Sequence, residues 1–342
     1  MGDVVTNTNV KQEGAVAPAE ENSGFLARLR GGPSWRGFFL HYAMVWVLIL
    51  LAVFAVTVYG GFFTPSNLNT MIAQVASTGV VAVGMTYAII CGGFDLSVGA
   101  VFAGASVAYA GLANHLPLWA AFVCTVLIGV ICGLINGLLI TKLRVNAFIA
   151  TLATSSLFAG VTLLYDTSGP ILTTKAGFQT LGTGKWGGVW ITVYVLVAFV
   201  VVFGIVLART PYGRSIYAVG GNLEAARLAG MQTNAVRVST FVMTAVCAAV
   251  GGMMVASQTG VGEANIGATV TLNSIAIVII GGTSLLGGEG AMWRTAVGIL
   301  IWGTLDNIFA AKALGTAQQL LIQAAIVIIA VSIDSFARLT RR

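Results

Sequence analysis

Charged side chains are scarce in this sequence. Only 8% of the 342 residues are Asp, Glu, Lys or Arg, whereas an average soluble domain has roughly 25%. This number of charges is too small to cover the surface that a chain of this length would expose to water. The composition therefore excludes an ordinary soluble protein. Hydrophobic residues make up 57% of the chain, and the mean hydropathy is +0.93. We therefore expect lipid to be the solvent around most of the chain.

Histidine, cysteine and acidic residues are also rare. The chain has two histidines, four cysteines and 11 acidic residues, and the cysteines fall in apolar runs without a Cys-x-x-Cys pair. It contains no His-Glu-x-x-His motif and no nucleophile elbow. We therefore expect no metal, no cofactor and no enzymatic activity.

Long apolar runs are what the sequence has instead. One crossing needs about 20 apolar helical residues, because the hydrocarbon core is about 30 Å thick and backbone groups in lipid must be hydrogen-bonded within the segment. The expected fold is all-α, a polytopic membrane helix bundle of about ten transmembrane helices with glycine-broken segments. The predicted spans are residues 40–59, 71–91, 97–114, 117–140, 147–165, 189–208, 237–257, 270–286, 292–311 and 317–336.

The basic residues predict the orientation. Ten spans place both termini on one side, and of the 17 basic residues only Lys175, Lys185 and Lys312 then fall on the other side. Since cytoplasmic loops are enriched in Lys and Arg, we expect both termini in the cytoplasm. Residues 1–37 are interpreted as a disordered cytoplasmic leader and residues 38–342 as the transmembrane domain. The net charge of +6 reflects this asymmetry and predicts no nucleic-acid partner.

The loop at about 209–236 is the most polar internal segment. Asn222 is a good helix N-cap, Glu224 would lie in the first turn, and Gly230 is a natural C-terminal stop. These residues predict a helix of about two turns, which is marginal unless it packs against something. Ala225, Ala226 and Ala229 would offer a smooth face. The helix either docks on a partner or rests on its own bundle.

Two glycine segments have the same pattern. Gly92-Gly93 and Gly281-Gly282 each begin a Gly-Gly-x-x-Leu-x-x-Gly sequence that follows an inward-running span. Paired glycine breaks in the two halves of a transporter indicate broken helices around a translocation path. Neither segment ends in Lys followed by Ser or Thr, so neither is a phosphate-binding loop.

Asp95 is the most deeply placed acid. A buried charge in the membrane is costly, so Asp95 either faces a polar cavity or caps the helix that follows it. Asn136 and Thr151 are able to line a path for a hydroxylated solute or to form hydrogen bonds between helices. An ion-gradient-driven secondary transporter or channel is the alternative function, but it would require acids or histidines deep in several spans.

Four ordered motifs resemble one known family over residues 40–336. The chain resembles the permease subunit of bacterial ABC importers for monosaccharides, of the ribose, xylose and arabinose type. The motifs are Gly92 to Gly99, Asn136 to Leu152, Thr210 to Asn222 and Gly281 to Gly290. The order and spacing of all four make the resemblance specific.

The resemblance implies partners and a location that the residues alone do not. A cytosolic ABC ATPase, a periplasmic sugar-binding protein and a second permease subunit, in a homo- or heterodimer, would complete an importer in the bacterial inner membrane. The short helix would be the coupling helix that sits in a cleft of the ATPase. The residues it assigns to ATPase coupling are Asn222, Glu224, Ala225, Ala226, Arg227 and Gly230. Those expected along the translocation path are Gly92, Gly93, Asp95, Asn136, Thr151, Gly281 and Gly282.

Overall fold

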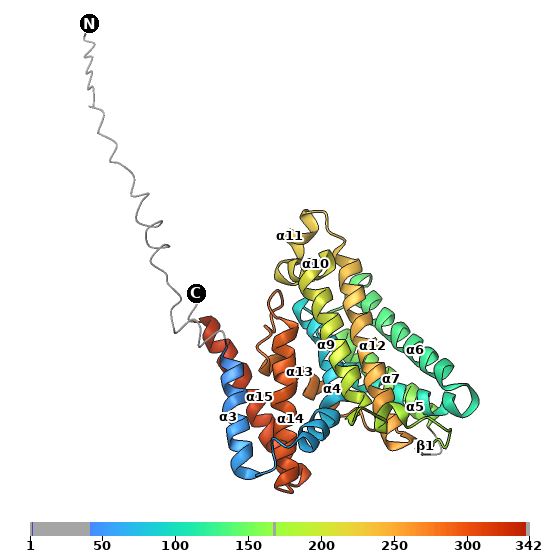
Figure 1. Ribbon diagram of the computed structural model, residues 1–342. Helices are drawn as coiled ribbons and strands as arrows, with labels where there is room; N and C mark the ends of the chain where they lie inside the picture. The colour runs from blue at the N-terminus through green and yellow to red at the C-terminus, as the bar shows by residue number, and fades with distance from the viewer. Residues whose placement is uncertain (1, 3–41, 167–168, 340–342) are drawn as a thin grey trace. The chain divides into compact units, whose positions relative to one another are not determined.

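The computed structural model describes residue 2 and residues 42–166 and 169–339 (Figure 1). The leader expected at residues 1–37 therefore lies outside the described part of the chain, apart from residue 2. Residues from Met44 onward form one compact unit. Within the described residues there are thirteen helices and two pairs of two-residue strands, so the fold is all-α with minor β pairing.

A helix overlaps each of the ten predicted spans. These helices are α3 (Ala43–Val58), α4 (Pro65–Ile90), α5 (Val98–His115), α6 (Leu118–Thr141), α7 (Ala147–Tyr165), α9 (Ile191–Arg209), α12 (Thr233–Thr259), α13 (Val270–Ile280), α14 (Met292–Ala311) and α15 (Thr316–Leu339). The three remaining helices are α8 (Thr180–Thr183), α10 (Pro211–Gly221) and α11 (Leu223–Leu228).

In the described part of the chain, five helices are long and apolar enough to cross a membrane, namely α4, α6, α7, α9 and α12. They divide into two groups by burial. In α4 and α12, 72% and 67% of the most apolar window is buried inside the protein, whereas in α6, α7 and α9 the figures are 22%, 28% and 17%. Exposed apolar faces of that length are stable against lipid and not against water. The chain is therefore an all-α membrane protein.

Helix α13 is shorter than the predicted span 270–286. It ends at Ile280, because Gly281 and Gly282 stop it. Its 11 residues extend about 16 Å at 1.5 Å per residue, which is less than the roughly 30 Å of a hydrocarbon core. The predicted span 270–286 therefore runs past the end of the helix, which stops at the Gly281-Gly282 break that the sequence indicates.

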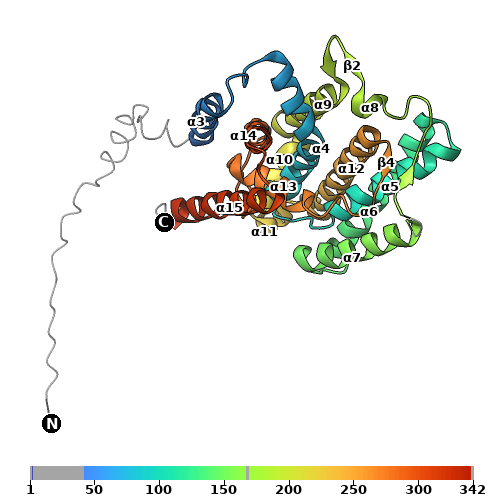
Figure 2. The same ribbon diagram turned by 90° about the horizontal axis from the view of Figure 1, so that it is seen from below.

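Helix α12 lies at the centre of the packing, with α4, α5 and α6 around it (Figure 2). Glycines on α6 permit this close approach. A Cβ atom at Gly133 would lie 2.5 Å from the Cα of Val242, and one at Gly137 would lie 2.8 Å from the Cα of Val238. Small residues allow helix backbones to approach where lipid supplies no hydrophobic driving force. A larger residue at Gly133 would push α6 away from α12.

Residues 169–188 pack on the end of the bundle opposite α11 (Figure 1). Phe178 is buried and stacks on Tyr109 of α5 with ring centroids 4.8 Å apart. The Ser257 hydroxyl at the end of α12 donates to the Phe178 carbonyl and accepts from the Gly182 amide. The two β pairs are β1 (Ile171–Leu172) with β4 (Val261–Gly262), and β2 (Lys185–Trp186) with β3 (Val189–Trp190). Most of this segment is therefore ordered structure.

Candidate functional site

Helix α10 begins at a Thr-Pro pair. The Thr210 hydroxyl accepts a hydrogen bond from the Gly213 amide at 3.1 Å, and Pro211 occupies the first turn, where its missing N–H has no intrahelical partner to lose. Ile216 and Val219 are buried against the bundle. The sequence predicted one short helix in the stretch 209–236, whereas the structure has two. Thr210-Pro211 was the signal that would have revealed the first.

Two tyrosines hold α10 against its neighbours. The Tyr212 hydroxyl and the Ser239 hydroxyl on α12 are 2.7 Å apart. The Tyr217 hydroxyl donates to the Gly290 carbonyl at 2.8 Å. Burial raises the pKa of both tyrosines above the ordinary value, so both hydroxyls stay protonated at neutral pH. Helix α10 is therefore fixed to α12 on one side and to the segment before α14 on the other.

The helix predicted after Asn222 is present as α11. The Asn222 side-chain oxygen accepts from the Ala225 amide at 2.9 Å, and Glu224 lies in the first turn, where the helix dipole favours an acid. Gly230 has φ of 79°, and the next amide, that of Met231, donates to the Ala226 carbonyl at 3.1 Å. This pattern is a Schellman stop, which requires a left-handed residue. The helix has six residues, somewhat less than two turns.

Helix α11 has a small buried face and a large exposed one. Ala226 is buried, whereas Ala225 and Ala229 are exposed, so the smooth face expected from the three alanines is divided between the bundle and the surface. Leu223 is 42% exposed and Leu228 is 80% exposed. Helix α11, which is too short to be stable alone, therefore presents two apolar side chains at the surface.

Three glycine segments meet where α10 ends, and we call this place the glycine junction: Gly92, Gly220 and Gly288. The Gly288 amide donates to the Ile90 carbonyl at the end of α4, at 2.8 Å. A Cβ atom at Gly220 would overlap that same carbonyl and lie 2.9 Å from the Gly288 nitrogen. Only a glycine at position 220 allows three backbones to approach this closely. Gly220, three positions before the first residue of α11, therefore packs directly on the ends of the segments that contain Gly92 and Gly288.

The two Gly-Gly breaks have the same hydrogen-bond pattern. After α4, the Gly92 amide donates to the Ile89 carbonyl and the Gly93 amide to the Ala88 carbonyl. After α13, Gly282 donates to Ile279 and Thr283 to Val278. Each is a Schellman stop with a left-handed glycine, Gly92 in one and Gly282 in the other. The left-handed residue is therefore the first glycine of the pair after α4 and the second glycine of the pair after α13.

Gly281 and Gly282 lie apart from the glycine junction. A Cβ atom at Gly281 would lie 2.5 Å from the Arg294 carbonyl on α14, so this glycine allows α13 and α14 to pack closely. Gly282 lies against Met44 of α3. Gly93 packs on the ring of Phe241. Of the four glycines that the sequence assigned to the translocation path, only Gly92 belongs to the junction. Gly288 closes the second Gly-Gly-x-x-Leu-x-x-Gly sequence, and Gly220, in the Gly220-Gly221 pair, was not singled out.

Asp95, Asn136 and Thr151 belong to one buried polar network. Asp95 Oδ1 accepts from the Ser97 amide at 2.9 Å and the Ser97 hydroxyl at 2.6 Å, and Ser97 is the N-cap residue of α5. The Asn136 amide nitrogen on α6 donates to the Ser97 hydroxyl at 2.7 Å and to Asp95 Oδ1 at 3.4 Å.

The network continues onto α7. The Thr154 hydroxyl donates to Asn136 Oδ1 at 2.6 Å, and the Thr151 hydroxyl donates to the Phe94 carbonyl at 3.2 Å. Asp95, Asn136 and Thr151 are fully buried and line neither of the two pockets described below. These polar groups tie the segment after α4 to α6 and α7.

Replacing Asp95 tests whether its oxygen or its charge matters. Asp95→Ala is expected to lower stability by about 1–3 kcal/mol, because Ser97 and Asn136 lose a buried acceptor. Asp95→Asn keeps an acceptor oxygen and is expected to stay within about 1 kcal/mol of the parental protein. Thermal unfolding in detergent compares the two. An equal loss in both variants would show that the charge itself is required.

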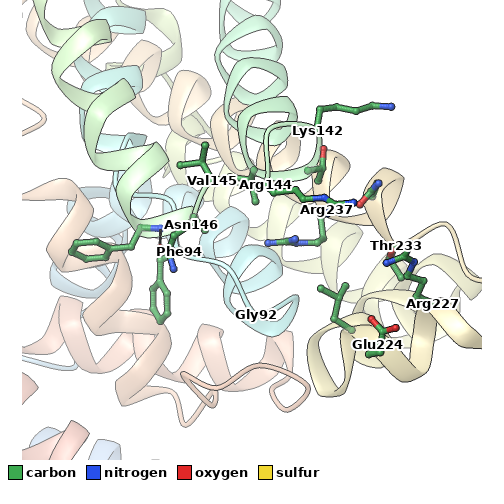
Figure 3. A pocket seen from close by; sticks show the side chains of 16 residues that line it. Gly92, Phe94, Lys142, Arg144, Val145, Asn146, Glu224, Arg227, Thr233 and Arg237 are labelled. Atoms are coloured by element: carbon green, nitrogen blue, oxygen red, sulfur yellow. Dashed lines mark hydrogen bonds between the residues drawn. The ribbon is translucent and has the colours of Figure 1, made fainter.

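A pocket of about 960 Å³ opens beside α11 (Figure 3). Its wall includes Gly92 and Phe94 from the segment after α4, the turn between α6 and α7, and the facing residues of α11 and α12. Four of its lining residues are basic: Lys142, Arg144, Arg227 and Arg237. Glu224 is the one acid among the described residues that line it. Among the described residues, no three His, Cys, Asp or Glu side chains gather where they could hold a metal ion.

Comparison with known proteins assigns the chain to a family. Residues 67–331 match the family described as branched-chain amino acid transport system / permease component. The chain is 37% identical to the ribose import permease protein RbsC of Bacillus subtilis (strain 168), over 84% of this chain and 90% of that protein. It is 31% identical to the L-arabinose ABC transporter permease protein AraH of Azospirillum brasilense, over 98% and 96%. No solved structure matches the chain.

The chain therefore belongs to this family of membrane permease components. The resemblance inferred from the four motifs is confirmed, and the relatives are parts of transporters rather than enzymes. Together with the apolar helices, the family indicates a multi-pass protein of the bacterial inner membrane. The α10–α11 segment and the glycine junction thus lie in a transporter subunit.

Proposed function

We propose that this chain is the membrane-spanning permease subunit of an ATP-driven importer that passes a monosaccharide, or a sugar-like solute, into the cytoplasm. Relatives named for ribose and for L-arabinose import support the substrate class. The complete importer would contain a cytosolic ABC ATPase, a periplasmic sugar-binding protein and a second permease subunit, in a homo- or heterodimer. The permease would have about ten crossings with both termini in the cytoplasm, as the distribution of Lys and Arg predicts.

The glycine junction is the observation that supports this function most directly. Helix α11 exposes Leu223 and Leu228, and Gly220, at the end of α10 that adjoins α11, packs on the Ile90 carbonyl at the end of α4. A partner that grips α11 is thereby connected through one short helix to the bundle. The coupling surface we propose comprises Asn222, Glu224, Ala225, Arg227, Leu223, Leu228 and Gly230, with Ala226 holding α11 to the bundle.

The mechanism follows from that connection. ATP closes the paired ATPase subunits and draws the two coupling helices together. Since α10 is anchored by Tyr212 and Tyr217, the displacement is passed to α4, α12 and the segment before α14 rather than absorbed in a flexible loop. The bundles then open outward, accept the sugar from its binding protein, and return after hydrolysis. A solute shifts such an equilibrium only by its differential affinity for the two states, so the nucleotide cycle supplies the work.

The polar network has a positioning role in this scheme. Asp95, Asn136 and Thr151 hold the segment after α4 against α6 and α7, and that segment carries Gly92 of the junction. We assign to these residues the role of fixing the end of α4 in position against α6 and α7. Gly93, Gly281 and Gly282 act in the same way, as points where helices end or approach closely along the proposed path.

Uptake into vesicles tests the proposed function. The permease is reconstituted with or without its ATPase, with labelled sugar and loaded binding protein outside the vesicles and the ATPase facing the ATP-containing side. Sugar accumulation is expected only with both the ATPase and ATP, and a protonophore is expected to leave it unchanged. Uphill accumulation by this chain alone, or loss of uptake with the protonophore while ATP is present, would favour the gradient-driven alternative.

A further inference from the structure

The pocket beside α11 carries an uncompensated positive charge. Lys142 and Arg144 come from the turn after α6, Arg227 from α11 and Arg237 from α12 (Figure 3). In the part of the chain that the structure describes, none of these four side chains is recorded in an ion pair or a hydrogen bond, and Glu224 is the one acid in the lining. A concave surface lined by one sign of charge concentrates oppositely charged groups from solution.

Arg237 adds a second indication of a ligand. It lies in the first turns of α12 and is partly buried. Its guanidinium has no ion pair or hydrogen bond to another described residue, so its N–H donors are free to bind an anionic group. A guanidinium binds phosphate and carboxylate groups through paired N–H donors. An anionic headgroup in the pocket would satisfy Arg237.

An apolar groove of about 730 Å³ adjoins this pocket. Leu134 and Leu138 of α6 face Val238 and Val242 of α12 across it, and Lys142 and Arg227 line both cavities. The groove therefore begins at the basic residues and continues between two helices. A basic mouth joined to an apolar groove fits an amphiphile with an anionic head.

The exposed face of α6 extends the groove along the helix. Exposed apolar residues recur every three or four positions on one stripe, at Val123, Leu127, Ile131, Leu134 and Leu138. The next position of the series is Lys142. The stripe is about 22 Å long at 1.5 Å per residue, which exceeds the roughly 15 Å depth of one leaflet of the hydrocarbon core. One acyl chain lying along α6 would thus have apolar contact over its whole length.

We propose that this is a binding site for one anionic phospholipid, with its phosphate between Lys142, Arg144 and Arg237 and an acyl chain in the groove between α6 and α12. The assignment to the cytoplasmic leaflet rests on the proposed function. An acidic segment of a partner protein would match the charge, but it would leave the apolar groove unfilled. Because Arg227 belongs to both cavities and to α11, the bound lipid would link the composition of the membrane to the coupling helix.

Lipid titration tests the site without any partner protein. The purified full-length chain in detergent is titrated with phosphatidylglycerol or phosphatidylethanolamine of identical acyl chains, and the bound fraction is read by native mass spectrometry. Phosphatidylglycerol is expected to bind more tightly. Arg144→Gln with Arg237→Gln is expected to weaken its binding about thirtyfold, because each basic residue near an anionic headgroup contributes roughly a fivefold factor. Binding of phosphatidylethanolamine should barely change.

Matched variants separate this site from the alternatives. Arg209→Gln with Arg214→Gln removes the same charge from the α9–α10 region outside both pockets, and it should leave phosphatidylglycerol binding near parental. Ala235→Trp places a bulky ring in the groove and should weaken binding at least tenfold while leaving glycerol 3-phosphate unaffected.

Three outcomes would overturn the proposal. An equal loss in the Arg209 and Arg214 control would mean that a general positive edge binds the lipid. Glycerol 3-phosphate that competes as well as the whole lipid, with no effect of Ala235→Trp, would indicate a site for a free phosphate. Loss of ATPase association in the Arg144 and Arg237 variant, with lipid binding unchanged, would assign the pocket to a partner protein. None of these results depends on whether the solute is a sugar.

Discussion

Gly220→Ala is expected to abolish transport, although it adds a single methyl group. The new Cβ atom would overlap the Ile90 carbonyl and lie 2.9 Å from the Gly288 nitrogen. Both neighbours are backbone atoms, so no rotamer change relieves the clash. Alanine favours a helix over glycine by about 1 kcal/mol, but overpacking typically costs 1–3 kcal/mol and a backbone that cannot move lies at the upper end. The added methyl group should therefore displace the end of helix α10 from the glycine junction.

The neighbouring glycine supplies the control for this prediction. A Cβ atom at Gly221 would meet only the Gly288 Cα, at 3.9 Å, which is ordinary van der Waals contact. Gly221→Ala should therefore insert, fold and transport like the parental protein. ATP-dependent sugar uptake in reconstituted vesicles distinguishes the two variants. If Gly220→Ala transports at the rate of Gly221→Ala, the junction does not carry the motion of the coupling helix.

Leu228→Asp is expected to detach the ATPase while leaving the permease folded. Leu228 is 80% exposed, so changing it should alter the stability of the chain by no more than about 0.5 kcal/mol. Burial of a leucine side chain in an interface contributes about 2 kcal/mol, and a carboxylate there adds a desolvation penalty. Association should therefore weaken by at least about thirtyfold. Co-purification and permease-stimulated ATP hydrolysis measure the loss.

Leu172→Asp is the matched control for the coupling helix. Leu172 is 71% exposed and lies in β1, at the end of the bundle opposite α11 (Figure 1). The substitution is chemically the same and equally exposed, so the ATPase should bind the Leu172 variant normally. Equal ATPase binding by both variants would show that α11 is not the docking surface. Weaker binding by both would point to a general effect of the added charge.

Local signals in the sequence predicted a large part of the fold. Each of the ten apolar runs contains a helix, because a long apolar segment in lipid must form its backbone hydrogen bonds internally. The location of α11 followed from Asn222 and Gly230, which act through contacts within a few residues. The sequence was therefore sufficient to predict a helix end that is determined by such short-range hydrogen bonds.

Long-range contacts explain what the sequence did not predict. The contact of helix α10 with the bundle was not predicted, because Gly220 packs on Ile90 and Gly288, which are distant from it in the sequence. The burial of Ala226, rather than Ala225 or Ala229, depends on how α11 packs on the bundle. The basic pocket joins Arg144 to Arg237 across two helices, and no spacing along the chain indicates that they share one cavity.

Composition and motif order determined that this is a membrane-embedded permease, because scarcity of charge and long apolar runs leave lipid as the solvent. Tertiary structure decided how the parts are joined: which glycines meet, which side chains of α11 remain outside, and where the basic residues gather. The physical reason is that hydration and local hydrogen bonding act on each segment separately. Backbone approach at the glycine junction, in contrast, depends on three segments that come together only after the helices have packed.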